Sequence, residues 1–135
     1  MEEYIRETCK TLNVEWVVYI LRSWTKPNMM YVGCTNNIVR RLRQHNGLIS
    51  GGAKYTRAYK PWCLAALVPV ENQSDALSLE YWAKAKNYKS KAGIPRDDPV
   101  IRRLYLIHKS MVKHNYRQIV YCDEEFKRVS GFKTN

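Results

Sequence analysis

The sequence predicts a small α/β (α+β) domain built on a mainly antiparallel three-stranded sheet flanked by helices. The length of 135 residues suits one domain of ordinary size, and a hydrophobic fraction of 45% is sufficient for one core. Strand-like and helix-like patterns follow in the order β-β-α-β-α, which indicates a sheet with helices packed on it. We expect an N-terminal helix or arm over residues 1–15, a core over 16–90 and a helical C-terminal extension over 91–135.

The strands are predicted from runs of β-branched and aromatic residues bounded by turn residues. They are expected over residues 16–21 (WVVYIL), 29–32 (MMYV) and 62–70 (WCLAALVPV). The first two are joined by the short segment SWTKPN and should therefore be antiparallel. We expect Gly33 to end the second strand and Pro69 to mark the end of the third.

Helix boundaries are indicated by capping residues. Asn36 or Asn37 can cap a helix that stops at Gly47, and Ser74 or Asp75 can open a second helix that runs to residue 89. The intervening segment LISGGAKYTRAYKP reads as a glycine-rich, basic loop. Further along, the patterns predict a helix over 98–114, a strand over 117–122 and a short helix over 123–129.

Several protein classes are not expected from this composition. No apolar run approaches the roughly 18 residues needed to cross a bilayer, and the acidic start MEEYIRETCK does not resemble a signal peptide. The 4 cysteines show no CxxC spacing, so we expect free thiols and no zinc site. These features predict a soluble intracellular protein that does not associate with membranes.

Charge indicates the kind of partner. The chain has 23 Lys and Arg against 12 Asp and Glu, a net charge of +11. Residues 16–70 contain no acidic residue, so their basic side chains lack nearby sequence partners. A generally basic surface is the plain alternative, but an external polyanion explains the pattern better. Because the bases do not form the polar face of one amphipathic helix, nucleic acid is favoured over a membrane.

The helix after Gly33 carries charge on its packing face. Arg41 and His45 stand with Ile38 and Leu42 at helical spacing, so all four share one side. In the alternative interpretation Arg41 extends along the core edge and His45 lies at the surface. For His45 alone that alternative is preferable, but for the pair beside a basic surface a functional site is the better explanation.

Glu80 lies beside Leu79 on the expected buried side of the second helix. A buried carboxylate needs a cation, which is a salt-bridged arginine in one interpretation and a metal ion in the other. With Arg41 and His45 facing the same sheet, a hard divalent ion on an oxygen ligand becomes the favoured alternative.

Two tyrosines occupy the first two strands. Tyr19 ends the triplet VVY, and after 11 further residues Tyr31 begins YVG. Together with TNNIVRRLRQHNG, GGAKYTR and ALSLEYWAKA, this paired pattern resembles the GIY-YIG endonuclease superfamily over residues 16–90. The first triplet departs from the family pattern by lacking Gly and Ile but keeps its tyrosine. The linked set of motifs is specific, whereas one YVG would mean little.

The resemblance implies a DNA endonuclease with catalytic residues Tyr19, Tyr31, Arg41, His45 and Glu80. Glu80 would hold one Mg²⁺ or Mn²⁺, Arg41 would bind phosphate oxygens, and Tyr19 would accept a proton from the attacking water, with Tyr31 and His45 positioning the water or relaying the proton. A free phenol has a pKa near 10, so we expect nearby positive charge to lower the pKa of Tyr19.

The resemblance is strongest to nuclease subunits of eukaryotic structure-specific endonucleases, which implies branched DNA, repair or recombination, and a protein scaffold that the sequence does not identify. Those subunits carry a zinc-binding RING-type domain, which we do not expect here because the necessary length and cysteines are missing. The expected DNA-binding residues are Arg40, Arg43, Lys54, Arg57 and Lys60. Two alternatives stay open: a catalytically silent nucleic-acid-binding module on the same fold, and an unrelated basic RNA-binding protein.

Overall fold

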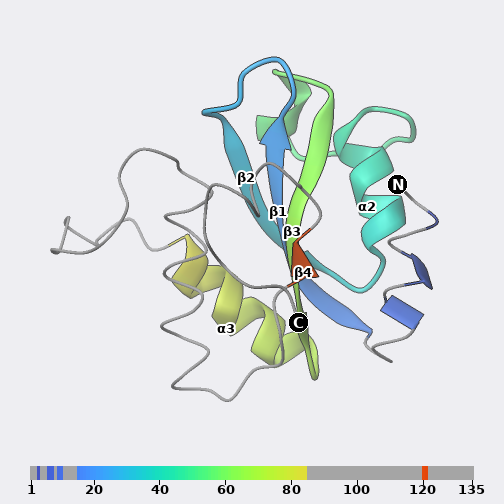
Figure 1. The fold of residues 1–135 in the computed structure, drawn as a ribbon, viewed down its shortest axis with the longest axis vertical. Coiled ribbons are helices and arrows are strands. Elements are labelled where there is room, and N and C mark those ends of the chain that lie inside the picture. Colours follow the sequence, from blue (N-terminus) through green and yellow to red (C-terminus); the bar gives the residue numbers. More distant parts are fainter. Residues whose placement is uncertain (1–2, 4–5, 8, 11–14, 85–119, 122–135) are drawn as a thin grey trace, which may run out of the picture.

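The computed structural model describes residues 3, 6–7, 9–10, 15–84 and 120–121. The elements, in chain order, are β1 (Trp16–Ser23), β2 (Met30–Thr35), α2 (Ile38–His45), the 3₁₀ turn η1 (Tyr55–Arg57), β3 (Trp62–Val70), α3 (Gln73–Ala83) and β4 (Val120–Tyr121) (Figure 1). The described residues within 3–10 are helical, in keeping with the predicted N-terminal helix. Across the described residues, no helix has the length and apolar character required to cross a bilayer.

The sheet confirms the predicted antiparallel core and adds a short edge strand. Its strand order is β2-β1-β3-β4, and all neighbours are antiparallel. The fourth strand has 2 residues and falls within the strand predicted over 117–122. The helices predicted over 98–114 and 123–129, and the rest of the extension 91–135, lie outside the described residues.

The second strand is longer than predicted, because Gly33 does not end it. Gly33 pairs with Tyr19 across the first hairpin, and the strand continues to Thr35. A Cβ atom at Gly33 would lie 2.6 Å from Cζ of Tyr19, so the missing side chain leaves room for the phenol. This glycine therefore serves side-chain packing inside the strand. Pro69 is likewise inside β3, which ends one residue later at Val70.

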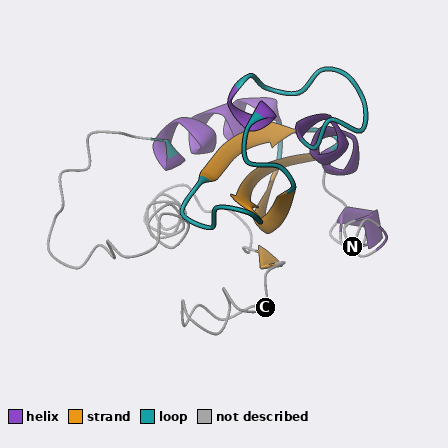
Figure 2. Ribbon diagram, turned by 90° about the horizontal axis from the view of Figure 1, so that it is seen from above, coloured by secondary structure: helices purple, strands orange, loops and turns teal. Residues whose placement is uncertain are grey.

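Alternate side chains of β1 point to opposite faces of the sheet. Val18 and Ile20 pack in a core with Leu79 of α3, whereas Val17 and Tyr19 pack in a second core with α2 and the start of β3. The two helices accordingly cover different faces (Figure 1), and Figure 2 shows the twisted strands with the helices beside them.

The ends of α2 are as predicted, but the start of α3 is not. Asn37 caps α2 by accepting a hydrogen bond from the backbone N–H of Arg40, and Gly47 follows the helix with φ +74°. For α3 the cap is Asn72, not Ser74 or Asp75, because its side-chain oxygen accepts from the backbone N–H of residue 75 at 2.8 Å. The predicted continuation of this helix over 85–89 lies outside the described residues.

Candidate active site

Tyr19 lies in the central part of β1 and points toward α2. Its side chain is only 1% exposed, and its hydroxyl lies 2.7 Å from Nε2 of His45. The close approach depends on Gly33, which leaves space for the ring on the neighbouring strand. The phenol is therefore held in one orientation by packing and by a buried polar contact.

His45 is the last residue of α2 and is also 1% exposed. The predicted shared face of Ile38, Leu42 and His45 is confirmed, and the alternative of a surface histidine is wrong. Its second ring nitrogen, Nδ1, lies 2.8 Å from Oγ1 of Thr56. Burial, with a smaller contribution from the charge of Arg41, lowers the pKa of His45 to about 4. The imidazole is therefore neutral near pH 7 and can accept a proton.

Tyr31 on β2 joins the same cluster. Its ring centre lies 6.3 Å from that of Tyr19, 4.8 Å from that of His45 and 6.0 Å from that of Tyr55 in η1. Aromatic pairs at these separations attract each other. The two motif tyrosines and the histidine thus form one aromatic group at the edge of the sheet.

Arg41 supplies the positive charge of the cluster. Its Nη1 donates to Oε1 of Gln44 at 2.9 Å and to the carbonyl of Gly51 at 2.8 Å. The side chain also hydrogen-bonds Tyr19. Because a guanidinium only donates, the Tyr19 oxygen is the acceptor in that contact. The guanidinium of Arg41 is therefore held by the glycine-rich loop while it contacts Tyr19.

The expected lowering of the Tyr19 pKa is wrong. Burial raises the pKa of Tyr19, since desolvation disfavours the phenolate. The hydrogen bond from Arg41 lowers the pKa but does not outweigh burial, and the charge of Glu80 adds a smaller upward effect. The phenol therefore holds its proton at neutral pH, and any role in proton transfer requires an acceptor for that proton.

Glu80 on α3 carries the carboxylate of the site and is 20% exposed. Lys84, one helical turn further on, places Nζ 2.7 Å from Oε1 of Glu80. The alternative interpretation of a salt bridge to an arginine is wrong in its partner, because the cation on Glu80 is a lysine. The same ammonium lies 5.5 Å from the ring centre of Tyr31, which connects Glu80 to the aromatic group. Burial, followed by the contact with Glu80, raises the pKa of Cys34 to about 12.

The geometry favours a cation beside Glu80. No group of three or more His, Cys, Asp or Glu side chains is placed to hold a metal in the described part of the chain. A single carboxylate ligand suits a hard divalent ion that keeps most of its water shell. A soft, thiolate-rich or imidazole-rich metal site is not formed by these residues.

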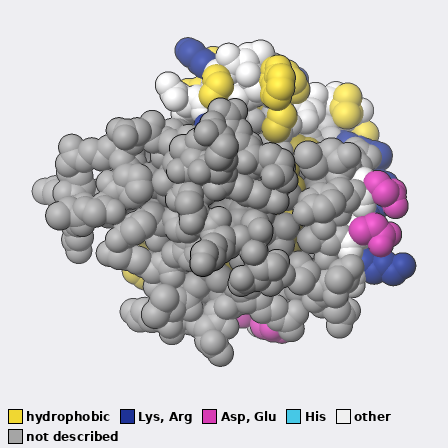
Figure 3. All heavy atoms as spheres, viewed as in Figure 1, with side chains coloured by type: hydrophobic (Ala, Val, Ile, Leu, Met, Phe, Trp, Pro, Cys, Tyr) yellow, Lys and Arg dark blue, Asp and Glu magenta, His cyan; other side chains and the backbone are white. Residues whose placement is uncertain are grey.

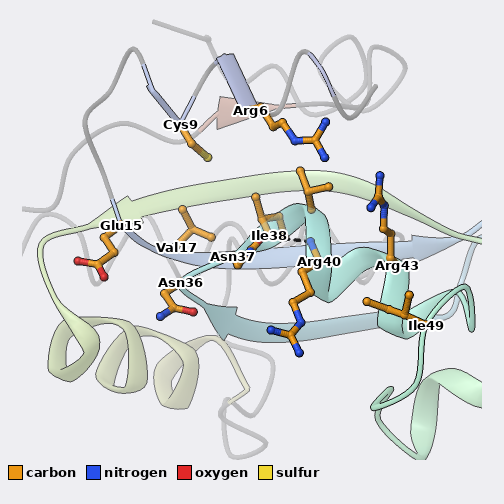
Figure 4. A pocket seen from close by; sticks show the side chains of 11 residues that line it. Arg6, Cys9, Glu15, Val17, Asn36, Asn37, Ile38, Arg40, Arg43 and Ile49 are labelled. Atoms are coloured by element: carbon orange, nitrogen blue, oxygen red, sulfur yellow. Dashed lines mark hydrogen bonds between the residues drawn. The ribbon is translucent and has the colours of Figure 1, made fainter.

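The basic residues predicted to bind DNA divide into two groups. Arg40 and Arg43 line a pocket of about 460 Å³ with Arg6 and Cys9 (Figure 4). Arg57 and Lys60 line a second pocket of about 530 Å³, which also includes His45 and Thr56. Lys54 is exposed on the same loop.

Arg40 and Arg43 are separated from the other basic residues by helix geometry, because positions 40 and 43 lie on the side of α2 away from positions 41 and 45. On the face shown in Figure 3, the upper edge carries mainly hydrophobic and uncharged side chains, and basic side chains are visible both there and at the right edge, beside acidic ones. Positive charge is therefore available on more than one side of the helix that carries the site.

Sequence reasoning missed Thr56 and Lys84. Thr56 is fully buried in the loop between α2 and β3, although a threonine in a basic glycine-rich segment reads as a surface residue. Lys84 could have been found from its spacing of four from Glu80, which is the ordinary spacing of a helical ion pair.

The sequence model of the GIY-YIG catalytic domain matches residues 15–92, which is more than half of the chain. The chain belongs to the GIY-YIG family. The matched segment includes every member of the aromatic, basic and acidic cluster described above.

The chain is also similar to curated proteins. The GIY-YIG domain is 51% identical over 53 residues to the structure-specific endonuclease subunit SLX1 of Malassezia globosa, covering 39% of this chain and 12% of the relative. It is 40% identical over 77 residues to that of Podospora anserina, covering 56% and 22%. The SLX1 homolog of Giardia intestinalis is 41% identical over 63 residues, covering 46% and 18%. The matched part is thus less than a quarter of each of these relatives.

Proposed function

We propose that this protein is a metal-dependent endonuclease that hydrolyses phosphodiester bonds in DNA. The observation that carries the proposal is the buried hydrogen bond between Tyr19 and His45, at 2.7 Å, with the Arg41 guanidinium beside it. A neutral imidazole, a phenol and a fixed cation in contact are the groups needed to move a proton and to stabilise negative charge. The relatives named as structure-specific endonuclease subunits support the same reaction.

The proton of the attacking water passes through Tyr19. The water O–H bond breaks as its oxygen bonds to phosphorus, and the proton goes to the Tyr19 oxygen while the phenol gives its own proton to Nε2 of His45. The P–O bond on the opposite side of the phosphorus breaks, and the leaving oxygen departs with the electron pair and takes a proton from solvent. This coupled transfer avoids a free phenolate, which the raised pKa of Tyr19 disfavours. His45 is neutral at the start because burial lowers its pKa to about 4, and it becomes an imidazolium only as the water attacks.

Arg41 stabilises the charge that develops on the phosphate. Its planar guanidinium can hold two non-bridging oxygens at once, a geometry that lysine does not offer. The contacts of Arg41 with Gln44 and Gly51 fix the fork before substrate binds, so little reorganisation is needed in the transition state. Tyr31 stands between the phenol and Lys84, where it can orient the attacking water.

Glu80 is the residue that would hold Mg²⁺ or Mn²⁺. The carboxylate fits this role, because it already holds the Lys84 ammonium at 2.7 Å and is only 20% exposed. When bound, such an ion supplies charge stabilisation to the scissile phosphate and the leaving oxygen.

The DNA is expected to be branched. The basic side chains around α2 and its following loop suit phosphate contacts, which position DNA without reading its sequence. Flaps and four-way junctions bend more cheaply than continuous duplex, so a basic site can select them by deformability. Because the relatives are named as subunits, we include a protein partner in the proposal, and DNA repair or recombination as the process that presents such DNA.

The test compares cleavage of flap, four-way and linear DNA of shared sequence, with Mg²⁺ and with chelator. Wild type should cleave the branched forms in Mg²⁺. Tyr19→Phe should keep near-normal DNA affinity and lose about 10² to 10⁴ in rate, the contribution of a general base. Binding without cleavage by wild type would instead support a silent module, and preference for RNA would support the RNA-binding alternative. Glu80→Gln is the matched control, expected to bind DNA without cutting it.

A further inference from the structure

A chain of hydrogen bonds connects the Tyr19 phenol to the loop before β3. His45 Nε2 lies 2.7 Å from the Tyr19 oxygen, and His45 Nδ1 lies 2.8 Å from Oγ1 of Thr56. Thr56 Oγ1 in turn donates to the carbonyl of Ala53 at 3.0 Å. The three side chains are buried, with exposed fractions of 1%, 1% and 0% in the order Tyr19, His45, Thr56. Buried polar groups such as these are normally paired within the protein.

The contacts of Thr56 indicate where the hydrogen of the neutral His45 ring lies. A hydroxyl has a single hydrogen to donate, and that of Thr56 goes to the Ala53 carbonyl. With its hydrogen directed to the Ala53 carbonyl, the oxygen of Thr56 accepts from His45 Nδ1, which then carries a hydrogen. In a neutral imidazole the other nitrogen, Nε2, is then the acceptor.

The Tyr19 end agrees with this arrangement. The Tyr19 oxygen accepts a hydrogen bond from Arg41, which has no acceptor to offer in return. The hydrogen of the phenol needs its own acceptor, and His45 Nε2 at 2.7 Å is in position. The tautomer with hydrogen on Nδ1 and none on Nε2 satisfies the hydrogen bonds at both ends.

We propose that Thr56 is a positioning residue that holds His45 in the Nδ1-protonated tautomer, so that Nε2 is ready to receive the Tyr19 proton. The role in catalysis rests on the proposed function, but the tautomer itself does not. In the opposite tautomer Nε2 would donate to the phenol oxygen, and the proton of Tyr19 would have no acceptor. The path from the attacking water to His45 would then be closed.

Thr56 is itself held in place by its surroundings. Its backbone N–H donates to Ala53 at 3.1 Å, and its carbonyl accepts from Nε1 of the buried Trp62 at 2.9 Å. These contacts use the backbone, so they survive a change of the side chain. A variant at Thr56 can therefore alter the hydroxyl while the loop stays anchored.

The experiment uses the whole chain with ¹⁵N-labelled histidine. Long-range ¹H–¹⁵N spectra at pH 7 show which ring nitrogen bears the hydrogen, and His45→Gln assigns the signals. Wild type should show Nδ1–H with an unprotonated Nε2. Thr56→Val has nearly the same shape but no acceptor, and it should move the hydrogen to Nε2. Thr56→Ser keeps the hydroxyl and should restore the wild-type pattern.

Single-turnover cleavage of flap DNA at saturating protein is measured on the same samples. Thr56→Val should be slowed by about tenfold or more, toward the range of 10² to 10⁴ for loss of a general base, with unchanged DNA affinity, and Thr56→Ser should be rescued. Wild-type protein with hydrogen on Nε2, or Thr56→Val with full activity, overturns the proposal. If Thr56→Val does not fold, the wild-type and Thr56→Ser spectra still decide the tautomer. An inactive wild type with the expected tautomer contradicts the nuclease function alone.

Discussion

The ammonium of Lys84 lies 2.7 Å from the carboxylate of Glu80 and 5.5 Å from the ring centre of Tyr31. A positive charge therefore already occupies the space beside the carboxylate that we assign to a divalent ion. Binding of Mg²⁺ or Mn²⁺ must compete with this ion pair, or displace Lys84 toward solvent, where its side chain is already 47% exposed.

Removing that charge should strengthen metal binding. We expect Lys84→Met to bind Mn²⁺ up to about fivefold more tightly, since an exposed ion pair contributes at most about 1 kcal/mol. Mn²⁺ titrations followed by electron paramagnetic resonance measure this without any cleavage assay. Glu80→Gln should lose the site in both backgrounds. Equal Mn²⁺ affinity in wild type and Lys84→Met would show that the ammonium does not compete.

The packing of Tyr19 against Gly33 predicts a second effect. Gly33→Ala places a Cβ atom 2.6 Å from Cζ of Tyr19 and still closer to its hydroxyl. The phenol must move, at a cost of about 1 to 3 kcal/mol in the free energy of unfolding, as in other overpacked cores. We expect the cleavage rate to fall as well, because the contact with His45 is disturbed.

A double-mutant cycle measured by urea unfolding tests whether the added methyl group acts through the hydroxyl of Tyr19. Gly33→Ala should destabilise the Tyr19→Phe protein less than wild type, since the nearest clashing atom, the hydroxyl oxygen, is then missing. Equal destabilisation in both backgrounds would mean that the added methyl group acts on the strand and not on the phenol.

The lowered pKa of His45 predicts how stability depends on pH. His45 has a pKa of about 4 in the folded protein, against about 6.5 in an unfolded chain. Between these values the unfolded state binds the extra proton, so the free energy of unfolding should rise with pH from about 4 to 6.5, with a slope of at most about 1.4 kcal/mol per pH unit. Above that range this group should add no further dependence.

Urea unfolding at several pH values tests this, with His45→Gln as the reference that removes the group. The difference between the two proteins should grow between pH 4 and 6.5 and be flat above it. In the pH–rate profile, the fall in cleavage rate at low pH should be centred near pH 4. A fall centred near pH 6.5 would indicate that His45 titrates as an exposed imidazole.

DNA affinity should depend strongly on salt because Lys and Arg displace counterions from phosphates. Each lost phosphate contact should reduce the log–log slope by about 0.9 on duplex DNA. We expect flatter slopes for both Arg40→Gln/Arg43→Gln and Lys54→Gln/Arg57→Gln/Lys60→Gln, with the single-turnover rate at saturation unchanged. A wild-type salt slope for Arg40→Gln/Arg43→Gln would mean that the DNA contacts only the side of α2 that carries the loop. A large loss of the single-turnover cleavage rate in either variant would mean that these residues include a catalytic group.

Local patterns in the sequence were enough to predict most of the helices and strands and five residues of the candidate site, but not Thr56 or Lys84. Runs of β-branched and aromatic residues predicted the three long strands, and Asn36 or Asn37 with Gly47 predicted the ends of α2, because strand preference and capping act over a few residues. Helical spacing was enough to place Arg41 and His45 on the packing face. The same short-range rules led to errors at Gly33, where pairing with β1 extends the strand, and at the start of α3, where Asn72 is the cap.

Only the tertiary structure decided the chemical state of the site. Burial beneath α2 raises the pKa of Tyr19 despite the nearby Arg41, the reverse of the sequence-based expectation. Thr56 contacts His45 although the two residues are 11 positions apart in the sequence, and the hydrogen-bond chain that they share depends on how the loop packs against α2. Desolvation and contacts between distant segments depend on the packed arrangement, which no local pattern records.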